Sequence, residues 1–292
     1  MNGFVNLLKP PGMTSHDVVQ VVRKTLQTRS VGHTGTLDPA AAGVLVLTVG
    51  QATRLGEYLL ESDKSYRAEI TLGISTDSGD AEGVITGCAS ATDVSEDRVR
   101  TALAELTGTI SMRPPAHSAV SVGGKRLYKL AHAGKQVEAP ERTVTIREMK
   151  LLEFHPADHE PTARALVDVT CSKGTYIRSL AQMLGDKLGC GAYLSMLLRT
   201  EVGAYTIATA VTLEELAQDP AQHLTTAREA LPHLPQPTVG DQECEALKQG
   251  QAVNVTPPLP TGPLLVYNGA GDLICLGEAT DGLLRPRKVF AK

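Results

Sequence analysis

Apolar residues in the first quarter of the chain follow two periods, one typical of helices and one typical of strands. Residues 15–26 carry valine and leucine at helical spacing on one stripe, with Thr14 or Ser15 as the N-cap. Residues 44–49 (VLVLTV) form a short apolar run between two glycines, which predicts a buried strand. Residues 66–72 alternate apolar and polar side chains, which predicts a second strand.

The same two patterns continue further along the chain. Residues 95–106 repeat the helical spacing behind Ser95 as N-cap, and residues 175–188 form another helical stretch. Residues 142–154 and 165–171 are rich in strand-forming side chains. Because helices and strands do not alternate one for one, we expect an α+β fold rather than a doubly wound one. The expected sheet is mixed, largely antiparallel and flanked by helices.

A proline-rich segment predicts a domain boundary near residue 230. Three prolines within residues 231–237 (LPHLPQP) are typical of a stiff, extended connector. After it, residues 264–267 and 273–276 predict two strands of a hairpin, joined by the turn NGAGD. We therefore expect a large domain over residues 1–230 and a small β-rich domain over residues 238–292.

Composition places the chain among intracellular globular proteins. It has 292 residues, 42% of them apolar and 21% charged, which is enough for a core without disulfides. The five cysteines lie outside any CxxC spacing, and the eight histidines form no pair suited to a metal on one helix. No apolar run approaches the roughly 20 residues of a membrane span, and the first residues do not resemble a secretion signal. We expect a cytoplasmic protein without a metal site.

Whole-chain charge argues against a nucleic-acid partner, but the distribution of charge reverses that argument. The formal net charge is −4, and the aromatic residues are only three Phe and seven Tyr. Residues 1–60 nevertheless hold five basic against three acidic side chains, and residues 111–155 hold eight against four. The acidic excess lies in residues 61–110 and 201–236. A net acidic chain can therefore present a basic face to RNA.

The densest candidate chemistry is the segment GHTGTLDPAAAG, residues 32–43. Gly32 and Gly35 allow tight turns, and Pro39 directs Asp38 away from helical backbone angles. A carboxylate on such a loop, beside a histidine and two threonines, suits a nucleophile or a general base. The ordinary alternative is an aspartate that bonds nearby backbone N–H groups in a turn. No phosphate-loop pattern and no GxGxxG pattern occurs, so a nucleotide-dependent enzyme is poorly supported.

Four motifs in order carry a family resemblance. They are KPPGMTSH at residues 9–16, the long block GHTGTLDPAAAGVLVLTVGQATR at residues 32–54, KSYRA at residues 64–68 and GTYIRSL at residues 174–180. Together they closely resemble the bacterial tRNA pseudouridine-55 synthase family, the TruB type, over essentially the whole chain. The resemblance implies a pseudouridine synthase fold, and the tail after residue 237 resembles a PUA-type RNA-binding module.

The resemblance also implies a reaction and a partner. Members of this family isomerise one uridine in the T loop of tRNA without cofactor or metal, after the base is flipped out of its stack. The expected partner is the tRNA T stem-loop, with no obligate protein partner and a monomeric enzyme. Asp38 stands at the position of the family's catalytic aspartate. It is expected to act as nucleophile, and both C1′ of the sugar and C6 of the base remain open as its target.

Three further residues match the family's base pocket. Arg178 matches the arginine that pairs with the catalytic aspartate, and such a cation lowers a carboxyl pKa. Tyr66 matches the tyrosine that stacks on the target uracil and is a candidate to accept the C5 proton. Tyr176 matches a second pocket aromatic, in contact with Tyr66 or with the base.

Four other positions are assigned by the resemblance to the pocket edge and its support. Leu198 matches the apolar pocket wall, although an ordinary core leucine explains it nearly as well. His33 matches the histidine that fills the space of the flipped base. Lys9 and Pro10 match a motif that braces the catalytic loop, a supporting rather than a chemical role.

A basic segment resembles the family's insertion that closes over the T arm. We expect this insertion at about residues 111–150, with its positive charge on four side chains around Tyr128, namely Lys125, Arg126, Lys129 and Lys135. Structured RNA is recognised mainly by shape and backbone, so its side chains can vary.

Two alternatives of other classes stay open. The first is a catalytically idle protein of the same fold that binds or refolds tRNA. The second is a guide-RNA-dependent pseudouridylase subunit, which works with partner proteins. The intact set of Asp38, Tyr66 and Arg178 argues against the idle protein.

Overall fold

The computed structural model describes residues 1–115, 121–122, 125–126, 139–158, 160–256 and 259–290. Its strands are β1 (Gly3–Lys9), β2 (Val31–His33), β3 (Ala42–Val49), β4 (Lys64–Leu72), β5 (Ile74–Thr76), β6 (Ile85–Cys88), β7 (Gly108–Met112), β8 (Ser121–Val122), β9 (Lys125–Arg126), β10 (Arg142–His155), β11 (Ala163–Cys171), β12 (Ala192–Val202), β13 (Tyr205–Thr206), β14 (Val253–Asn254), β15 (Gly262–Tyr267), β16 (Leu273–Thr280) and β17 (Leu283–Val289). Its helices are α1 (Ser15–Thr25), α2 (Glu57–Leu60), α3 (Glu96–Glu105), α5 (Ile177–Leu188), α6 (Leu213–Gln218), α7 (Ala227–Ala230) and α8 (Asp241–Lys248), with 3-10 turns η1 (Gly50–Leu55) and η2 (Ile207–Thr209).

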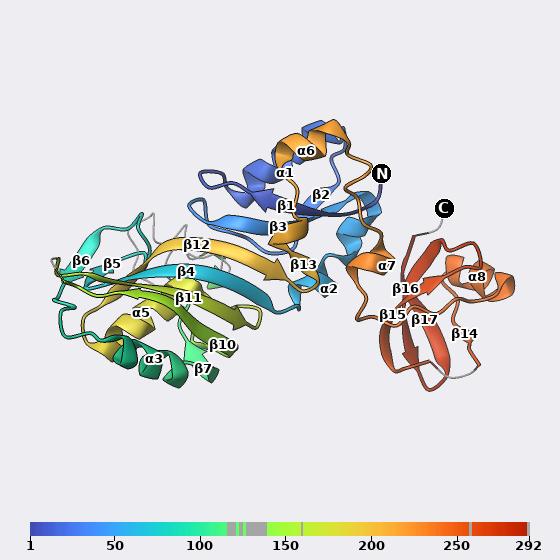
Figure 1. The fold of residues 1–292 in the computed structure, drawn as a ribbon. Coiled ribbons are helices and arrows are strands. Elements are labelled where there is room, and N and C mark those ends of the chain that lie inside the picture. The colour runs from blue at the N-terminus through green and yellow to red at the C-terminus, as the bar shows by residue number, and fades with distance from the viewer. Residues whose placement is uncertain (116–120, 123–124, 127–138, 159, 257–258, 291–292) are drawn as a thin grey trace.

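The larger sheet is mixed and largely antiparallel. Its nine strands follow the order β1-β3-β12-β4-β11-β10-β7, with β2 beside β3 and β13 beside β12. Only the pairing of β3 with β12 is parallel, and the other pairings of this sheet are antiparallel. The expected α+β fold with a mixed sheet flanked by helices is therefore confirmed (Figure 1).

Strand β4 lies in the middle of this sheet, and its side chains alternate between a buried face and an exposed face. Tyr66, Ala68 and Ile70 on β4 are buried in the main core. Arg67 points to the other face, where its guanidinium forms an ion pair with Asp168 of β11 at 2.8 Å. Alternation along the strand thus places Tyr66 on the buried face.

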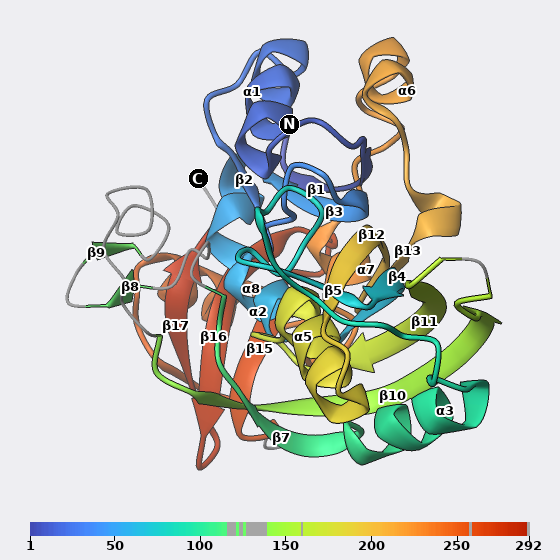
Figure 2. The same cartoon turned by 90° about the vertical axis from the view of Figure 1, so that its left-hand side faces the viewer.

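Helices α3 and α5 cover the buried face of the sheet (Figure 2). The N-caps follow the prediction, because the Thr14 hydroxyl accepts from the Asp17 amide at 3.0 Å and the Ser95 hydroxyl accepts from the Arg98 amide at 3.3 Å. Helix α1 covers a separate core under β1 and β3 through residues such as Val18.

The C-terminal segment forms the expected β-rich unit. Its sheet has the order β14-β17-β16-β15, and α8 packs on it through Leu247. The hairpin between β15 and β16 closes at the predicted turn, where the Asp272 amide donates to the Asn268 side chain at 2.7 Å. This unit lies at one end of the molecule, beside α7 and α2 (Figure 1).

The proline-rich connector is neither fully extended nor a free spacer, because the Leu234 amide donates to the Leu231 carbonyl at 3.1 Å in a turn. Its Pro235 and Pro237 carbonyls accept backbone hydrogen bonds from β15 at 2.9 Å each. A shared core joins the two units, and it includes Phe4 and Val44 from the large sheet and Leu265, Tyr267 and Leu276 from the small one. Apolar contact therefore holds the C-terminal unit against the rest of the protein.

Much of the predicted RNA-facing insertion lies outside the described residues. This holds for Tyr128, Lys129 and Lys135, and of Lys125 and Arg126 only the backbone, in β9, is described. Among the helices that the structure describes, none is long and apolar enough to cross a membrane.

Candidate active site

Asp38 lies on the loop between β2 and β3, and glycine makes the close packing of this loop possible. Gly43 follows the loop with φ of +112° and pairs with Arg199 of β12. A Cβ atom at this position would lie 2.1 Å from the Arg199 carbonyl oxygen. Only glycine fits such a close approach of two backbones.

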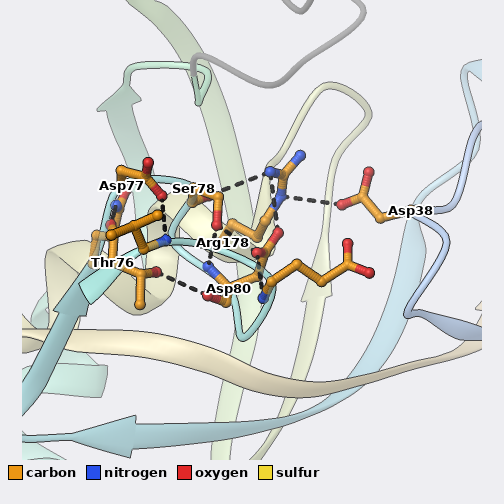
Figure 3. A network of polar contacts seen from close by, with 9 residues as sticks. Asp38, Thr76, Asp77, Ser78, Asp80 and Arg178 are labelled. Atoms are coloured by element: carbon orange, nitrogen blue, oxygen red, sulfur yellow. Dashed lines mark hydrogen bonds and ion pairs between the residues drawn. The ribbon is translucent and has the colours of Figure 1, made fainter. Parts of the chain in front are cut away.

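Arg178 holds the Asp38 carboxylate from the opposite side of the site. Its Nε lies 3.0 Å from Asp38 Oδ2, and its Nη1 lies 3.3 Å from Asp80 Oδ2. The same Nη1 donates to the Ser78 carbonyl at 3.3 Å. Arg178 is only 5% exposed, so these acceptors compensate a nearly buried cation (Figure 3).

Local helix electrostatics do not stabilise the charge of Arg178 at its position in α5. Arg178 lies in the first turn of α5, where the helix dipole disfavours a cation. The first turn contains no acidic side chain, and the N-cap residue Tyr176 makes no side-chain cap hydrogen bond. The fold therefore stabilises Arg178 through the two aspartates, which come from distant parts of the chain.

Asp80 is a site residue that the sequence analysis missed. The Ser78 hydroxyl donates to Asp80 Oδ1 at 2.5 Å, and the Thr76 hydroxyl donates to the Asp80 carbonyl at 2.8 Å. These bonds hold Asp80 toward Arg178 (Figure 3). The only sequence signal for a second acidic residue was Arg178 itself, because a buried cation commonly needs more than one acceptor.

The surroundings of Asp38 shift the pKa of its carboxyl group in opposing directions. Burial raises the carboxyl pKa of Asp38, the neighbouring Arg178 lowers it, and the nearby Asp80 raises it, with a net rise. The side chain is still 42% exposed, so it is accessible to a ligand. A carboxylate with a raised pKa is a better base and nucleophile when ionised.

Tyr66 lies on the buried face, directly across the strands from Arg199. It is 7% exposed, and burial raises the pKa of its hydroxyl while the adjacent Arg199 opposes that rise. The phenol therefore keeps its proton at neutral pH.

Tyr176 and His33 both lie near this site. Tyr176 packs against the core that contains Tyr66, with the Arg142 guanidinium 5.8 Å from its ring centroid. The Gly35 amide donates to His33 Nδ1 at 3.4 Å. Burial lowers the pKa of His33, so its ring is mostly neutral at pH 7 and suited to stacking.

Lys9 reaches from β1 to the loop that carries Asp38, and Pro10 contributes an acceptor beside it. The fully buried Lys9 Nζ donates to the carbonyls of Pro10 at 2.9 Å, Pro39 at 3.2 Å and Ala41 at 2.7 Å. Lys9 thus contacts the backbone that follows Asp38.

The structure does not bring Leu198 to the Tyr66 side of the sheet. Leu198 pairs with Arg67, so its side chain shares the exposed face. Leu197, one residue earlier, pairs with Ala68 and packs against the main core. A register shift between Leu194 and Met196 decides which of the two leucines faces the core, and the sequence alone does not reveal this shift.

Among the residues that the structure describes, no group of three or more His, Cys, Asp or Glu side chains is arranged to hold a metal ion. The charged groups that act on Asp38 are Arg178, Asp80 and Lys9.

Comparison with known protein families identifies the family of this chain. Residues 23–177 match the model of the TruB family pseudouridylate synthase N-terminal domain. Residues 178–238 match the tRNA pseudouridylate synthase B C-terminal domain, and residues 235–290 match the pseudouridine synthase II TruB C-terminal model. The fold and the matched domains are those of a pseudouridine synthase. The chain belongs to the TruB family of pseudouridylate synthases.

Individual relatives agree with this placement. A protein of Symbiobacterium thermophilum named tRNA pseudouridine synthase B is 50% identical over 86% of this chain and 83% of its own length. One of Heliobacterium modesticaldum with the same name is 42% identical over 100% of this chain and 96% of its own. A solved Cbf5-Nop10-Gar1 complex contains a chain with a TM-score of 0.74 and 28% identity, covering 99% of this chain and 85% of that one.

Proposed function

We propose that this protein is a tRNA pseudouridine synthase that isomerises uridine 55 in the T loop of tRNA. The observation that carries the proposal is the Asp38 carboxylate, partly exposed on a glycine-containing loop and held at 3.0 Å by Arg178. The proposal draws its RNA class from near full-length relatives named tRNA pseudouridine synthase B.

The reaction is an isomerisation, so every bond broken is replaced by one formed. The target base first leaves its stack, which costs a few kcal/mol. Ionised Asp38 then attacks C1′ of the ribose or C6 of the uracil. The N1–C1′ bond breaks, the uracil rotates and a C5–C1′ bond forms. The C5 proton leaves, N1 gains a proton, and the enzyme regains free Asp38.

Each surrounding residue has a proposed part in this sequence. Arg178 orients the carboxylate and favours its ionised form. Tyr66 stacks on the uracil, and it can accept the C5 proton only in its phenolate form, while Tyr176 borders the base. A base stacked on an aromatic ring is stabilised by about 1–3 kcal/mol. His33 fills the space in the T loop that the flipped base leaves.

The domain roles are also proposals. Residues 1–230 carry the chemistry, and an insertion at about residues 111–150 closes over the T arm. Residues 238–292 form a PUA-like unit that adds RNA contact. We further propose that the enzyme acts as a cytoplasmic monomer without an obligate protein partner or cofactor.

The decisive experiment uses the purified full chain and two RNAs, a T stem-loop and the same stem-loop with cytidine at the target position. Pseudouridine is detected by nucleoside chromatography after a time course without added guide RNA or protein. Conversion of the first RNA alone supports the proposal. Tight binding without conversion indicates the idle tRNA-binding protein. Conversion only after a guide RNA and partner proteins are added indicates the guide-dependent subunit.

A further inference from the structure

Arg199 is a buried arginine that none of the motifs above explains. It lies on β12 and is 2% exposed. Its Nε donates to the Val44 carbonyl at 2.7 Å, its Nη2 to the Gly35 carbonyl at 3.1 Å and its Nη1 to the Thr36 carbonyl at 3.4 Å. All three acceptors are backbone groups on either side of Asp38 in the catalytic loop and the strand after it.

Two other side chains hold the remainder of the same loop. Ser15 of α1 both accepts from the Leu37 amide at 2.9 Å and donates to the Leu37 carbonyl at 3.1 Å. Lys9 holds the Pro39 and Ala41 carbonyls on the other side of Asp38. The backbone before and after the nucleophile is therefore fixed by side chains from three separate elements.

The electrostatics of Arg199 differ from those of an ordinary buried ion pair. Within the described parts of the chain, no carboxylate lies within 4.0 Å of its guanidinium. Burial lowers the pKa of the neighbouring Lys64, and the charge of Arg199 lowers it further. A buried cation without a carboxylate is costly, and here only carbonyl dipoles compensate it. An apolar side chain would avoid this cost, so the guanidinium must contribute something other than burial.

Arg199 also connects the loop to the base-stacking residue. It pairs directly with Tyr66 across β12 and β4, on the same face of the sheet. The charge of Arg199 opposes the rise that burial causes in the pKa of the Tyr66 hydroxyl. One side chain therefore holds the backbone that carries Asp38 and also pairs across the strands with the residue proposed to bind uracil.

We propose that Arg199 is a positioning residue that fixes the Asp38 loop relative to Tyr66 for isomerisation. The proposal rests on the proposed function for its reaction, and on the hydrogen bonds above for its geometry. A displacement of about 1 Å in a catalytic group can reduce the rate roughly 100-fold. Arg199 thus acts on chemistry through the loop and Tyr66 rather than by touching the RNA.

The test compares R199M and R199K with the wild type as full-length proteins. Methionine keeps the apolar stem and removes all donors, whereas lysine restores a single donor. We expect R199M to lower the single-turnover rate roughly 100-fold, with the Kd for T stem-loop RNA within about threefold of wild type. R199K should recover part of the rate. R67M is the matched control, because Arg67 lies on the neighbouring strand and on the exposed face.

Two further measurements separate positioning from general stability. Hydrogen exchange should show lost protection for the amides of residues 35–38, 40 and 41 in R199M, while the amides of α3 remain protected. The single-turnover rate of the double variant R199M/Y66F should fall by less than the product of the two single-variant fold losses. Both changes act on one unit, so their effects are not independent.

Wild-type turnover in R199M, or equal losses of rate and RNA affinity in R199M and R199K, would overturn the proposal. If R199M does not fold, R199K and the exchange of its loop amides decide the question. If the wild type itself fails to isomerise uridine, the proposed function fails. The exchange data then still report whether Arg199 fixes the loop.

Discussion

Arg178 and Asp38 reach their 3.0 Å contact from two different supports, a helix first turn and a loop between strands. Neither element makes this contact favourable by itself, because a cation opposes the dipole of α5 and burial opposes the charge of Asp38. Each charge compensates the cost of the other only in part, because the Asp38 pKa stays raised although Arg178 lowers it. The predictions below test this arrangement and the structure around it.

Replacing the proposed nucleophile should abolish turnover and leave RNA binding intact. Asp38→Asn keeps the shape of the side chain and removes its nucleophilic oxygen anion. We expect the rate to fall at least about 1,000-fold, with Kd for T stem-loop RNA nearly unchanged. Single-turnover kinetics and a filter-binding assay measure the two quantities. Turnover within tenfold of wild type would remove Asp38 as nucleophile.

The raised pKa of Asp38 gives a pH dependence of activity and of stability. Activity needs the ionised carboxylate, so the rate should fall in acid with a midpoint above the ordinary aspartate pKa of 3.8. The folded protein binds this proton more tightly than the unfolded chain does. Stability from this group is therefore present at low pH and lost as the pH rises through the raised pKa.

It follows that Asp38→Asn should be at least as stable as the wild type at pH 7. Thermal unfolding at pH 7 and at pH 4 tests this sign, since any advantage of the variant should shrink in acid. The prediction would be wrong if the stability of the variant relative to the wild type were lower at pH 7 than at pH 4.

Asp80 should matter through Arg178 rather than through RNA. Asp80→Asn weakens one of the two ion pairs of Arg178 and leaves its side-chain size unchanged. Hydrogen bonds to charged groups contribute about 1.5–3 kcal/mol, so we expect a rate roughly 10- to 100-fold lower. Asp77→Asn is the matched control, because Asp77 binds the Val84 amide on the same loop. Equal effects of the two variants would argue against a specific role for Asp80.

Gly43→Ala should damage both stability and activity. The added Cβ would collide with the Arg199 backbone at 2.1 Å, in a residue whose φ is +112°. Gly108→Ala is the control, because Gly108 has a similar φ of +105° with no atom within 4 Å of the added Cβ. We expect the control to lose about 1–2 kcal/mol and Gly43→Ala to lose clearly more. Chemical denaturation of both variants measures the difference, and equal losses would exclude the close approach as its cause.

Removing the C-terminal unit should lower stability as well as RNA affinity. The sequence alone suggests that deletion of residues 238–292 mainly weakens tRNA binding, because the named catalytic positions precede residue 200. The structure adds that deletion uncovers Phe4 and Val44, which the C-terminal unit helps to bury. Loss of one large buried side chain costs about 2–5 kcal/mol, so the deleted protein should melt well below the full chain. An unchanged melting temperature would show that the shared core contributes little.

The predictable part of the fold was the part encoded by local signals. The helices at Ser15–Thr25 and Glu96–Glu105 follow from their caps and their apolar stripes. The hairpin of the C-terminal unit follows from its turn. By contrast, β1 at one edge of the sheet and β12 in its middle were not predicted, because strand formation depends on distant partners more than on local propensity.

The candidate site divides in the same way. Asp38 could be singled out from sequence because glycine and proline mark its loop within a few residues, and the family motifs added Arg178 and Tyr66. Those motifs did not place Asp80 or Arg199 in the site. The assignment of Leu198 to the pocket differed from the structure by one residue, because a register shift in β12 places Leu197 on the buried face.

The sequence by itself thus determined the capped helices, the C-terminal hairpin, the motif order and the candidate carboxylate, since each depends on residues that are neighbours in the chain. Only the tertiary structure decided which charges meet around that carboxylate. Arg178, Asp80 and Arg199 come together through the pairing of strands and the packing of α5, and a buried charge is stable only where such distant partners converge. The net charge of −4 carries none of this information, because it does not record which residues the fold brings together.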